Sequence, residues 1–564
     1  MSAKLSVDNI SNFMNLDNCS EYIPIYDLLN NQYIFNIDNS NSIIINNCSN
    51  YNILECEENN EKKNIFCKFA PIVNYTKYLA GKLENEDISI LPSQECKNGV
   101  CCEKMMQKHN AAYVDCLFYY LTSKSKNVDN FIHGLDFFGS FIGINKNYKI
   151  NIGDDMDVLI ESEYFHENID KKYTLENIED VFCENTSGKN KLSLQFSNES
   201  IEIENFNIEN LNDIQIITNN EFNRDSSENT INELKDNEII INGEIKIHDS
   251  DNSDTTISDD DDALSEKLTI ESLDDNDSLI ISGSGSDDDN SLPECLSDKE
   301  NEADDEEEDD EDYDEESECN IIANIYNFPV QAILLENCCE TLEEYMIKTD
   351  EISIDEWKSI FFQIIIMLCY YQDKYSFTHN DLHTGNIMYN ETDIEFLYYK
   401  YKNICYKVPT FGKIYKIIDF GRAIFTYNDT IFCSDAFSRG EDADTQYNCD
   451  PFFNDKKPRI EPNYSFDLCR LGCSLFDFFI DAMEEIDELV ESNPIISLIV
   501  EWCQDDNFKS VLYRKNGDER YPEFKLYKMI ARNVHRHIPE IQLKKELFKD
   551  YVTENIDHKQ MMIF

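Results

Sequence analysis

Basic residues are scarce in this chain of 564 amino acids, in which 48 lysines and arginines stand against 113 aspartates and glutamates. The formal net charge of −65 makes nucleic-acid backbones and anionic membrane surfaces poor partners for the molecule as a whole. No apolar run approaches membrane-spanning length, and the N-terminus lacks a basic region followed by an apolar core. We therefore expect a protein that is soluble and not secreted, with no membrane partner.

The CxxC motif is absent as well, although the chain contains 20 cysteines. The lack of any CxxC pair argues against a zinc site. Cysteines such as Cys67, Cys116 and Cys369 lie in apolar contexts instead. Reduced, buried thiols in a cytosolic or similarly reducing compartment are the expectation.

Two short motifs carry the chemistry that the sequence does contain. Residues 379–386 read H-x-D-x-x-x-x-N, and residues 419–421 read D-F-G. Phosphoryl transfer uses this order of a catalytic carboxylate, a metal-binding amide and a metal-binding carboxylate. Asp381 would meet the acceptor hydroxyl, while Asn386 and Asp419 would hold magnesium, because a triphosphate carries too much negative charge to be approached without cations. On its own, D-F-G would indicate only a buried turn.

Each motif also follows an apolar run that fits the element expected to carry it. Residues 357–369 are apolar on nearly every side, as in a buried helix, and residues 416–418 form a short β-rich run that ends at Asp419. On these residues the chain resembles the protein-kinase-like superfamily, and most closely the serine/threonine protein kinases of giant nucleocytoplasmic DNA viruses. The resemblance runs from about Ile65 to about Pro539, with an acidic insertion between.

The resemblance implies an α+β, bilobal protein-kinase-like fold with a long acidic disordered insertion. It also implies ATP and Mg²⁺ (or Mn²⁺) as cofactors. The implied parts are a β-rich N-lobe with one regulatory helix (1–160), the acidic insertion (161–320), the last N-lobe strand and hinge (321–345), and a helical C-lobe (346–564).

The N-terminal part predicts an antiparallel meander of four strands, over residues 33–35, 43–45, 51–54 and 65–69. In a kinase the first turn is a glycine-rich loop whose N–H groups cover the phosphates. Here residues 38–42 read DNSNS and contain no glycine. Asn and Asp tolerate positive φ, so a backbone nest can still form, but it would approach phosphate less closely.

Lys68 lies in an apolar stretch of the sequence. A lysine there needs a partner, because burying an unpaired charge is costly. The resemblance implies that Lys68 holds the α- and β-phosphates; the alternative is an ordinary exposed strand lysine. A helix capped by Asn110 over residues 111–121 is expected to present Asp115 to it, with Glu103 as the fallback. A solvated helix face is the alternative for Asp115.

Residues 328–336 predict the strand that enters the hinge. By resemblance, Leu335 lies at the back of the adenine pocket, and the backbone from Glu336 to Cys338 would bind the base. Residues 131–144 predict a strand pair, in which His133 is expected to be a structural hydrogen-bonding residue.

The predicted catalytic loop, residues 379–386, departs from a typical protein kinase at two positions. Asn380 replaces the usual Arg, so no cation is present there to bind a phosphate on the activation segment. His383 replaces the usual Lys, as in small-molecule phosphotransferases; a neutral His can donate one hydrogen bond to the γ-phosphate or acceptor but supplies less fixed charge. Asp467 and Gly472 match the opening of the large central helix, where by resemblance the Asp braces the catalytic loop.

Three further segments carry more than one interpretation. Residues 249–318 hold only two lysines and a charge of roughly −30, which predicts disorder. That tract is interpreted as a solvated linker or, alternatively, as a phosphorylation substrate at Ser258, Ser286 and Ser297. Residues 397–412 predict an extended hairpin, as a packed satellite or a docking face. The locally basic residues 516–537 would complement the acidic tract or, alternatively, bind nucleic acid. An Asn-Gly hairpin is also predicted within residues 238–247.

The predicted reaction is Mg²⁺-assisted transfer of the ATP γ-phosphoryl group to a Ser or Thr of a protein substrate. One alternative is a pseudokinase that binds partners through its fold and acidic tract, as the glycine-free loop suggests. A small-molecule phosphotransferase is the other, suggested by His383 and Gly385. The predicted location is the cytoplasm, which for a viral protein means the host cytoplasm or the virion. The sequence indicates neither the substrate nor the oligomeric state.

Overall fold

The computed structural model describes residues 3–37, 42–95, 101–177, 320–349, 351–514, 517–522, 524–554 and 561–563. All of them belong to one compact unit, Met1–Glu199 with Glu316–Phe564. The predicted hairpin at 238–247 and the acidic tract at 249–318 lie outside the described residues.

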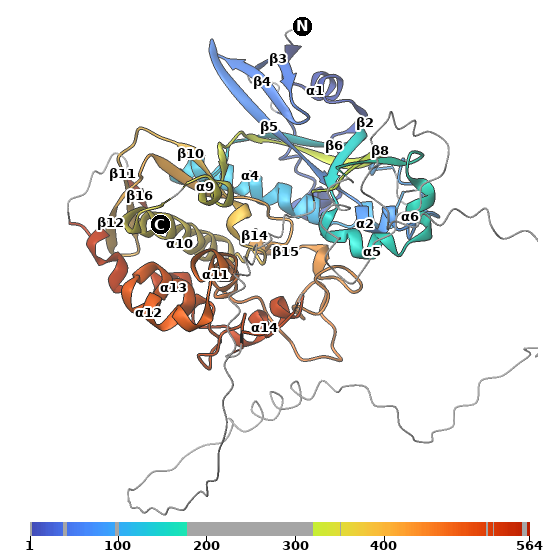
Figure 1. The fold of residues 1–564 in the computed structure, drawn as a ribbon. Coiled ribbons are helices and arrows are strands. Elements are labelled where there is room, and N and C mark those ends of the chain that lie inside the picture. The colour runs from blue at the N-terminus through green and yellow to red at the C-terminus, as the bar shows by residue number, and fades with distance from the viewer. Residues whose placement is uncertain are drawn as a thin grey trace, which may run out of the picture. The chain divides into compact units, whose positions relative to one another are not determined.

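An antiparallel sheet forms the first half of this unit (Figure 1). Its strands follow the order β1-β3-β4-β5-β8-β6-β2, and β7 pairs with β8. In the register, Lys68 lies opposite Ile333 and Phe66 opposite Leu335, so these four side chains share one face. The strands are β1 (Ala3–Lys4), β2 (Leu16–Ser20), β3 (Ile44–Ser49), β4 (Ile53–Glu58), β5 (Glu61–Pro71), β6 (Phe137–Asn151), β7 (Tyr173–Glu176) and β8 (Ile322–Glu336).

Helix α4 (Ala111–Asp129) lies between this sheet and helix α10 (Ile354–Tyr375) (Figure 1). The side chain of Asn110 caps α4 by accepting the N–H of Ala112 at 3.1 Å, as predicted. The ring of Phe118 lies 5.2 Å from that of Tyr371 on α10, so one helix links sheet and helical core. The shorter helices of the first half are α1 (Val7–Phe13), α2 (Tyr75–Leu79), α3 (Glu103–Met106), α5 (Met156–Ile160) and α6 (Glu163–Asn168).

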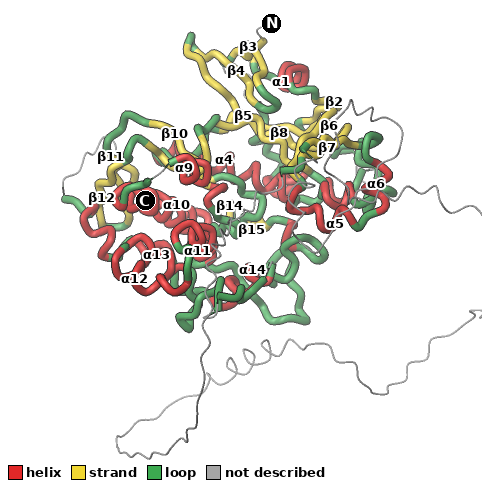
Figure 2. The backbone as a smooth tube through the Cα atoms, in the orientation of Figure 1, coloured by secondary structure: helices red, strands yellow, loops and turns green. Residues whose placement is uncertain are grey.

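The second half is mainly helical, as Figure 2 shows by colour. Its long helix α10 begins at the cap Ser353, ends at the left-handed Ser376, and is buried on nearly every side, which confirms the predicted buried helix. The other helices are α9 (Leu342–Lys348), α11 (Phe466–Phe479), α12 (Ile486–Ser492), α13 (Pro494–Trp502), α14 (Lys525–Asn533) and α15 (Pro539–Gln542).

This half also contains small β-sheets of two or three strands. The strands are β9 (Glu340–Thr341), β10 (Ile387–Glu391), β11 (Phe396–Tyr401), β12 (Ile404–Pro409), β13 (Lys413–Ile417), β14 (Ile424–Tyr427), β15 (Thr430–Cys433) and β16 (Met561–Ile563). β11 and β12 form the predicted hairpin, and β16 adds to it in parallel. Tyr399 on β11 is fully buried, as in a packed satellite hairpin.

Two strand predictions are wrong. Residues 33–35 form turns rather than a strand, and residues 38–41 of the predicted phosphate loop lie outside the described residues. The hairpin beside β5 is instead β3–β4, which turns at Asn50 with a left-handed φ of 57°. Residues 131–136 form a loop, so the predicted strand pair is the single long strand β6. Polar Asn, Asp and Gly positions mark turns in both segments without fixing where the paired strands begin.

α6 and β7 fall inside the range predicted as insertion, and β7 pairs with β8, so the described chain extends beyond the predicted boundary at residue 160. The structure records 16 free cysteines among the described residues, most of them buried. In the same part of the chain, no helix combines the length and apolar character needed to cross a membrane.

Candidate functional site

Lys68 joins two carboxylates from distant parts of the chain. Its Nζ lies 2.8 Å from Asp115 Oδ2 on α4 and 2.8 Å from Asp419 Oδ1 after β13. The Lys68 side chain is 23% exposed and that of Asp115 only 2%, so the lysine is a paired, mostly buried cation. The structure thus brings Lys68, Asp115 and Asp419 together, and the fallback partner Glu103 is wrong.

The two carboxylates differ in environment. Burial raises the pKa of Asp115 to about 6, although Lys68 works against that rise. Lys68 lowers the pKa of Asp419 to about 2, and the Asp419 side chain is 51% exposed. Asp419 is therefore an ionised carboxylate that can meet a second cation from solvent.

Helix α4 also holds the backbone of the D-F-G motif. Asp115 Oδ1 accepts the N–H of Phe420 at 2.7 Å, and Tyr119 Oη accepts the N–H of Asp419 at 2.8 Å. Asp115 and Tyr119 are four residues apart and so lie on one helix face. The buried Phe420 ring packs against Phe118, with centroids 4.6 Å apart. The helix therefore holds the backbone of Asp419 and Phe420, while Lys68 of β5 pairs with the Asp419 side chain.

Asp467 braces the catalytic loop from the start of α11. Its carboxylate accepts the N–H of His379 and the N–H of Asn380, each at 2.9 Å. The brace predicted by resemblance is therefore present. Asn380 adopts a left-handed φ of 66° and donates its side-chain amide to Arg422 O at 2.9 Å. It also accepts the hydroxyl of Tyr447 at 2.8 Å, so the residue that replaces the usual Arg is a buried structural link.

The rest of the catalytic loop is ordered by its own polar groups. Asn386 Nδ2 donates to Asp381 O at 2.9 Å, and the N–H of Ile418 donates to Asn386 O at 3.0 Å. These bonds tie Asp381, Asn386 and the segment leading to Asp419 into one cluster. His383 Nδ1 accepts the N–H of Gly385 at 3.2 Å, which places the proton of the neutral ring on Nε2. Burial lowers the pKa of His383, so the neutral ring is favoured.

Asp381 meets a residue that sequence reasoning did not identify. Tyr527 on α14 donates its hydroxyl to Asp381 Oδ1 at 2.8 Å, and Arg470 Nε donates to the same hydroxyl at 2.9 Å. Arg422 Nε lies 3.9 Å from Asp381 Oδ2. Arg470 stands inside the recognised opening of α11, but no local pattern in the sequence pairs it with Tyr527.

The predicted hinge is only partly as expected. Leu335 is 2% exposed and shares the sheet face of Lys68. The N–H of Glu336 already donates to Asp136 O at 2.9 Å, so this donor is not available to a base. The backbone of Asn337 and Cys338 is left for that role.

The side chain of Glu336 has a structural role that the sequence did not suggest. It pairs with Lys416 at 2.9 Å and Lys126 at 3.2 Å, and accepts the side-chain amide of Asn390 at 2.6 Å. Burial opposes ionisation of Glu336, but the two lysines outweigh it and lower its pKa to about 2. Lys416 is only 3% exposed, so Glu336 neutralises a buried cation behind the hinge.

The donor set fits a magnesium ion held together with phosphates. Asp419 and the side-chain amide of Asn386 offer hard oxygen donors, which Mg²⁺ prefers. Within the described ranges no group of three or more His, Cys, Asp or Glu residues could hold a metal by itself. Mg²⁺ is usually bound by one or two carboxylates plus substrate phosphates and water.

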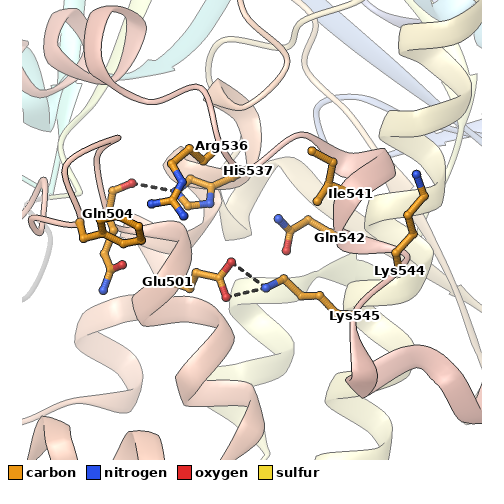
Figure 3. A pocket seen from close by; sticks show the side chains of 9 residues that line it. Glu501, Gln504, Arg536, His537, Ile541, Gln542, Lys544 and Lys545 are labelled. Atoms are coloured by element: carbon orange, nitrogen blue, oxygen red, sulfur yellow. Dashed lines mark hydrogen bonds and ion pairs between the residues drawn. The ribbon is translucent and has the colours of Figure 1, made fainter. Parts of the chain in front are cut away.

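A hollow of about 560 Å³ lies elsewhere, between α13 and the residues that follow α14 (Figure 3). None of the residues discussed above lines it. Lys545, which borders the hollow, forms an ion pair with Glu501, so its charge is already neutralised. The hollow therefore adds nothing to the cluster around Asp381.

His133 is the structural hydrogen-bonding residue that was predicted. Nδ1 lies 2.7 Å from Tyr415 O and Nε2 lies 2.8 Å from Tyr399 Oη, with the ring fully buried. It joins the loop before β6 to β13 and β11.

Comparison with known proteins adds no assignment: no protein-family model matches this chain, and no curated protein matches it.

Proposed function

We propose that this chain is an ATP-dependent protein kinase that transfers the γ-phosphoryl group to Ser or Thr of a protein substrate. The observation that carries the proposal is the pair of 2.8 Å contacts from Lys68 Nζ to Asp115 and to Asp419. In protein kinases, a strand lysine paired with a helix carboxylate and a separate carboxylate that can hold magnesium must both be in place for phosphoryl transfer. The fold that goes with this proposal is the two-lobed protein-kinase-like fold.

Each residue has a definite task in the proposed reaction. Lys68 binds the α- and β-phosphates, and Asp115 keeps it charged and oriented. Asp381 orients the acceptor hydroxyl and takes its proton, while His383 donates a hydrogen bond from Nε2. Asn386 and Asp419 would hold magnesium, which when bound neutralises charge on the transferred phosphoryl group. Asp467 keeps the loop that bears Asp381 and Asn386 in place.

Two other functions have specific support. A pseudokinase scaffold is favoured by the β3–β4 turn, which contains no glycine in residues 49–53. A small-molecule phosphotransferase is favoured by His383 and Gly385, because the loop resembles that of such enzymes at these positions. The free, mostly buried cysteines support a cytoplasmic, reducing location.

The test is transfer of label from γ-labelled ATP with Mg²⁺ to casein and to a panel of choline, sugars and aminoglycosides. We expect label on casein Ser and Thr with the wild type and none with Asp381→Asn, which keeps the side-chain volume but removes the base. Label only on a small molecule would favour the phosphotransferase. No label, together with no nucleotide-induced thermal shift, would favour the scaffold.

A further inference from the structure

The hydroxyl of Tyr527 occupies the position that an acceptor hydroxyl must take at Asp381. A catalytic base has to lie within about 2.6–3.2 Å of the oxygen whose proton it takes. Tyr527 Oη lies 2.8 Å from Asp381 Oδ1 and donates to it. The contact joins α14 to the catalytic loop across 146 residues of sequence, so folding rather than local chain geometry brings the two groups together.

The side chains around Tyr527 could stabilise a phosphate on its hydroxyl. Arg470 Nε donates to the hydroxyl at 2.9 Å. The guanidinium carbons of Arg470 and Arg422 lie 5.2 Å and 5.6 Å from the centre of the Tyr527 ring. Two guanidinium groups are the usual partners of a phosphorylated side chain, which gains −1.5 to −2 charges and pairs with arginine by charge-assisted hydrogen bonds.

The ring itself is held in place by packing. Phe524 stacks on Tyr527 with centroids 5.4 Å apart and planes at 19°, and Phe466 of α11 approaches to 6.1 Å. Stacking and two hydrogen bonds fix both the ring and its hydroxyl. A fixed acceptor lowers the entropic cost of reaching the reactive geometry.

We propose that Tyr527 is a modification site of this chain, the acceptor of an intramolecular phosphoryl transfer catalysed at its own Asp381. The inference rests on the proposed function. In the step, the bond between Pγ and the β,γ-bridging oxygen of ATP breaks and its electron pair leaves with ADP. The bond between Tyr527 Oη and Pγ forms, and the phenolic proton passes to the Asp381 carboxylate.

The product has a direct consequence for the same site. A phosphate on Tyr527 would be attracted by Arg470 and Arg422 and repelled by Asp381. The hydrogen bond from Tyr527 to Asp381 would be lost, because the phosphorylated oxygen has no proton to donate. Asp381 is then released to accept the hydroxyl of another substrate.

The experiment incubates the full chain with γ-labelled ATP and Mg²⁺, with and without casein, and maps the label by tandem mass spectrometry. We expect one phosphoryl group on the peptide that contains Tyr527, at an initial fractional rate that does not change when the protein is diluted. Asp381→Asn should abolish it. Tyr527→Phe should remove this label, whereas Tyr513→Phe should keep it. Tyr513 is a matched control, because its hydroxyl also meets a carboxylate, that of Asp477 at 2.8 Å.

The outcomes separate the two proposals. Label on casein with an unmodified Tyr527 in the wild type would overturn this inference and leave the proposed function standing, with the Tyr527 hydroxyl acting as a bracing hydrogen bond only. Fractional labelling that rises with protein concentration would overturn the intramolecular step. Label on neither casein nor Tyr527 would overturn both proposals. Mapping uses the wild-type chain, so it does not depend on whether the Tyr527→Phe variant folds.

Discussion

At the scale of single residues, buried charges decide where this molecule tolerates change. Glu336 neutralises Lys416, which is 3% exposed, and Lys126. Removing one partner of a buried pair leaves an uncompensated charge, which costs far more than the pair itself contributes. Glu336 was predicted to act through its backbone in the hinge, yet its side chain neutralises two lysines.

We therefore expect Glu336→Gln to lower the free energy of unfolding by about 3 kcal/mol. Urea unfolding followed by circular dichroism measures this change. The control is Glu546→Gln, because Glu546 forms an exposed pair with Lys549 that should contribute almost nothing. Equal effects of the two substitutions would contradict the role assigned to Glu336.

His133 supplies a pH dependence whose sign follows from burial. Burial lowers the pKa of His133 from 6.5 to about 4, so the folded chain binds fewer protons than the unfolded chain between these values. The stability contributed by the neutral ring is complete above about pH 6.5 and is lost as the pH falls toward 4. Stability therefore rises with pH across this window.

We expect the free energy of unfolding of the wild type, measured relative to His133→Gln, to fall by about 2 kcal/mol from pH 7 to pH 5. Denaturant unfolding of both proteins at the two pH values provides the measurement. Taking the difference removes the contribution of other titrating groups. A difference that is the same at both pH values would show that His133 is not held neutral by the fold.

At the scale of elements, α11 supports the catalytic loop through one side chain. Asp467 is fully buried and accepts two backbone N–H groups, those of His379 and Asn380. Each donor left without an acceptor in a buried site costs about 1–3 kcal/mol. The brace therefore contributes both to stability and to the position of Asp381.

We expect Asp467→Ala to lower the free energy of unfolding by about 2–6 kcal/mol and to abolish label transfer in the molecules that stay folded. Asp477→Ala on the same helix is the control, because Asp477 is exposed and accepts the hydroxyl of Tyr513 rather than backbone N–H groups of the loop. Unfolding curves and the γ-label assay measure the two effects. An active, equally stable Asp467→Ala protein would contradict the assigned role.

Elements with a local signal were predictable from the sequence, and contacts between distant elements were not. α10 was found because apolar residues fill it over several turns, and α4 because an apolar face follows the cap Asn110. The Lys68–Asp115 pair was accessible because a lysine in apolar surroundings needs a carboxylate. Tyr527 escaped prediction, since a tyrosine in a short basic helix has many equivalent roles until the tertiary fold selects one.

Strand pairing shows the same limit. The β3–β4–β5 strands follow runs that the sequence marks, but the first strand of the predicted meander does not form. Register and partner choice depend on long-range contacts, such as β5 with β8 across the acidic segment. Clusters of polar residues in the sequence indicate where one strand ends and the next begins. They do not indicate which hairpin lies beside Lys68.

At the scale of the whole molecule, the excess of negative charge shapes how a nucleotide can bind. The chain carries a formal charge of −65, which repels a free triphosphate at long range. A divalent cation held by Asp419 and Asn386, as proposed, would remove much of that repulsion at the site. Binding of ATP should therefore depend steeply on magnesium.

Calorimetric titration of ATP into the protein, with Mg²⁺ and with EDTA, tests the proposed nucleotide site most directly. We expect binding by the wild type only with Mg²⁺, loss of binding in Asp419→Asn, and wild-type binding in Asp429→Asn. Asp429 is an exposed matched control, because both aspartates have a φ of 61°, which Asn also adopts. Equal ATP affinity with Mg²⁺ and with EDTA, or an Asp419→Asn protein that binds like the wild type, would contradict it.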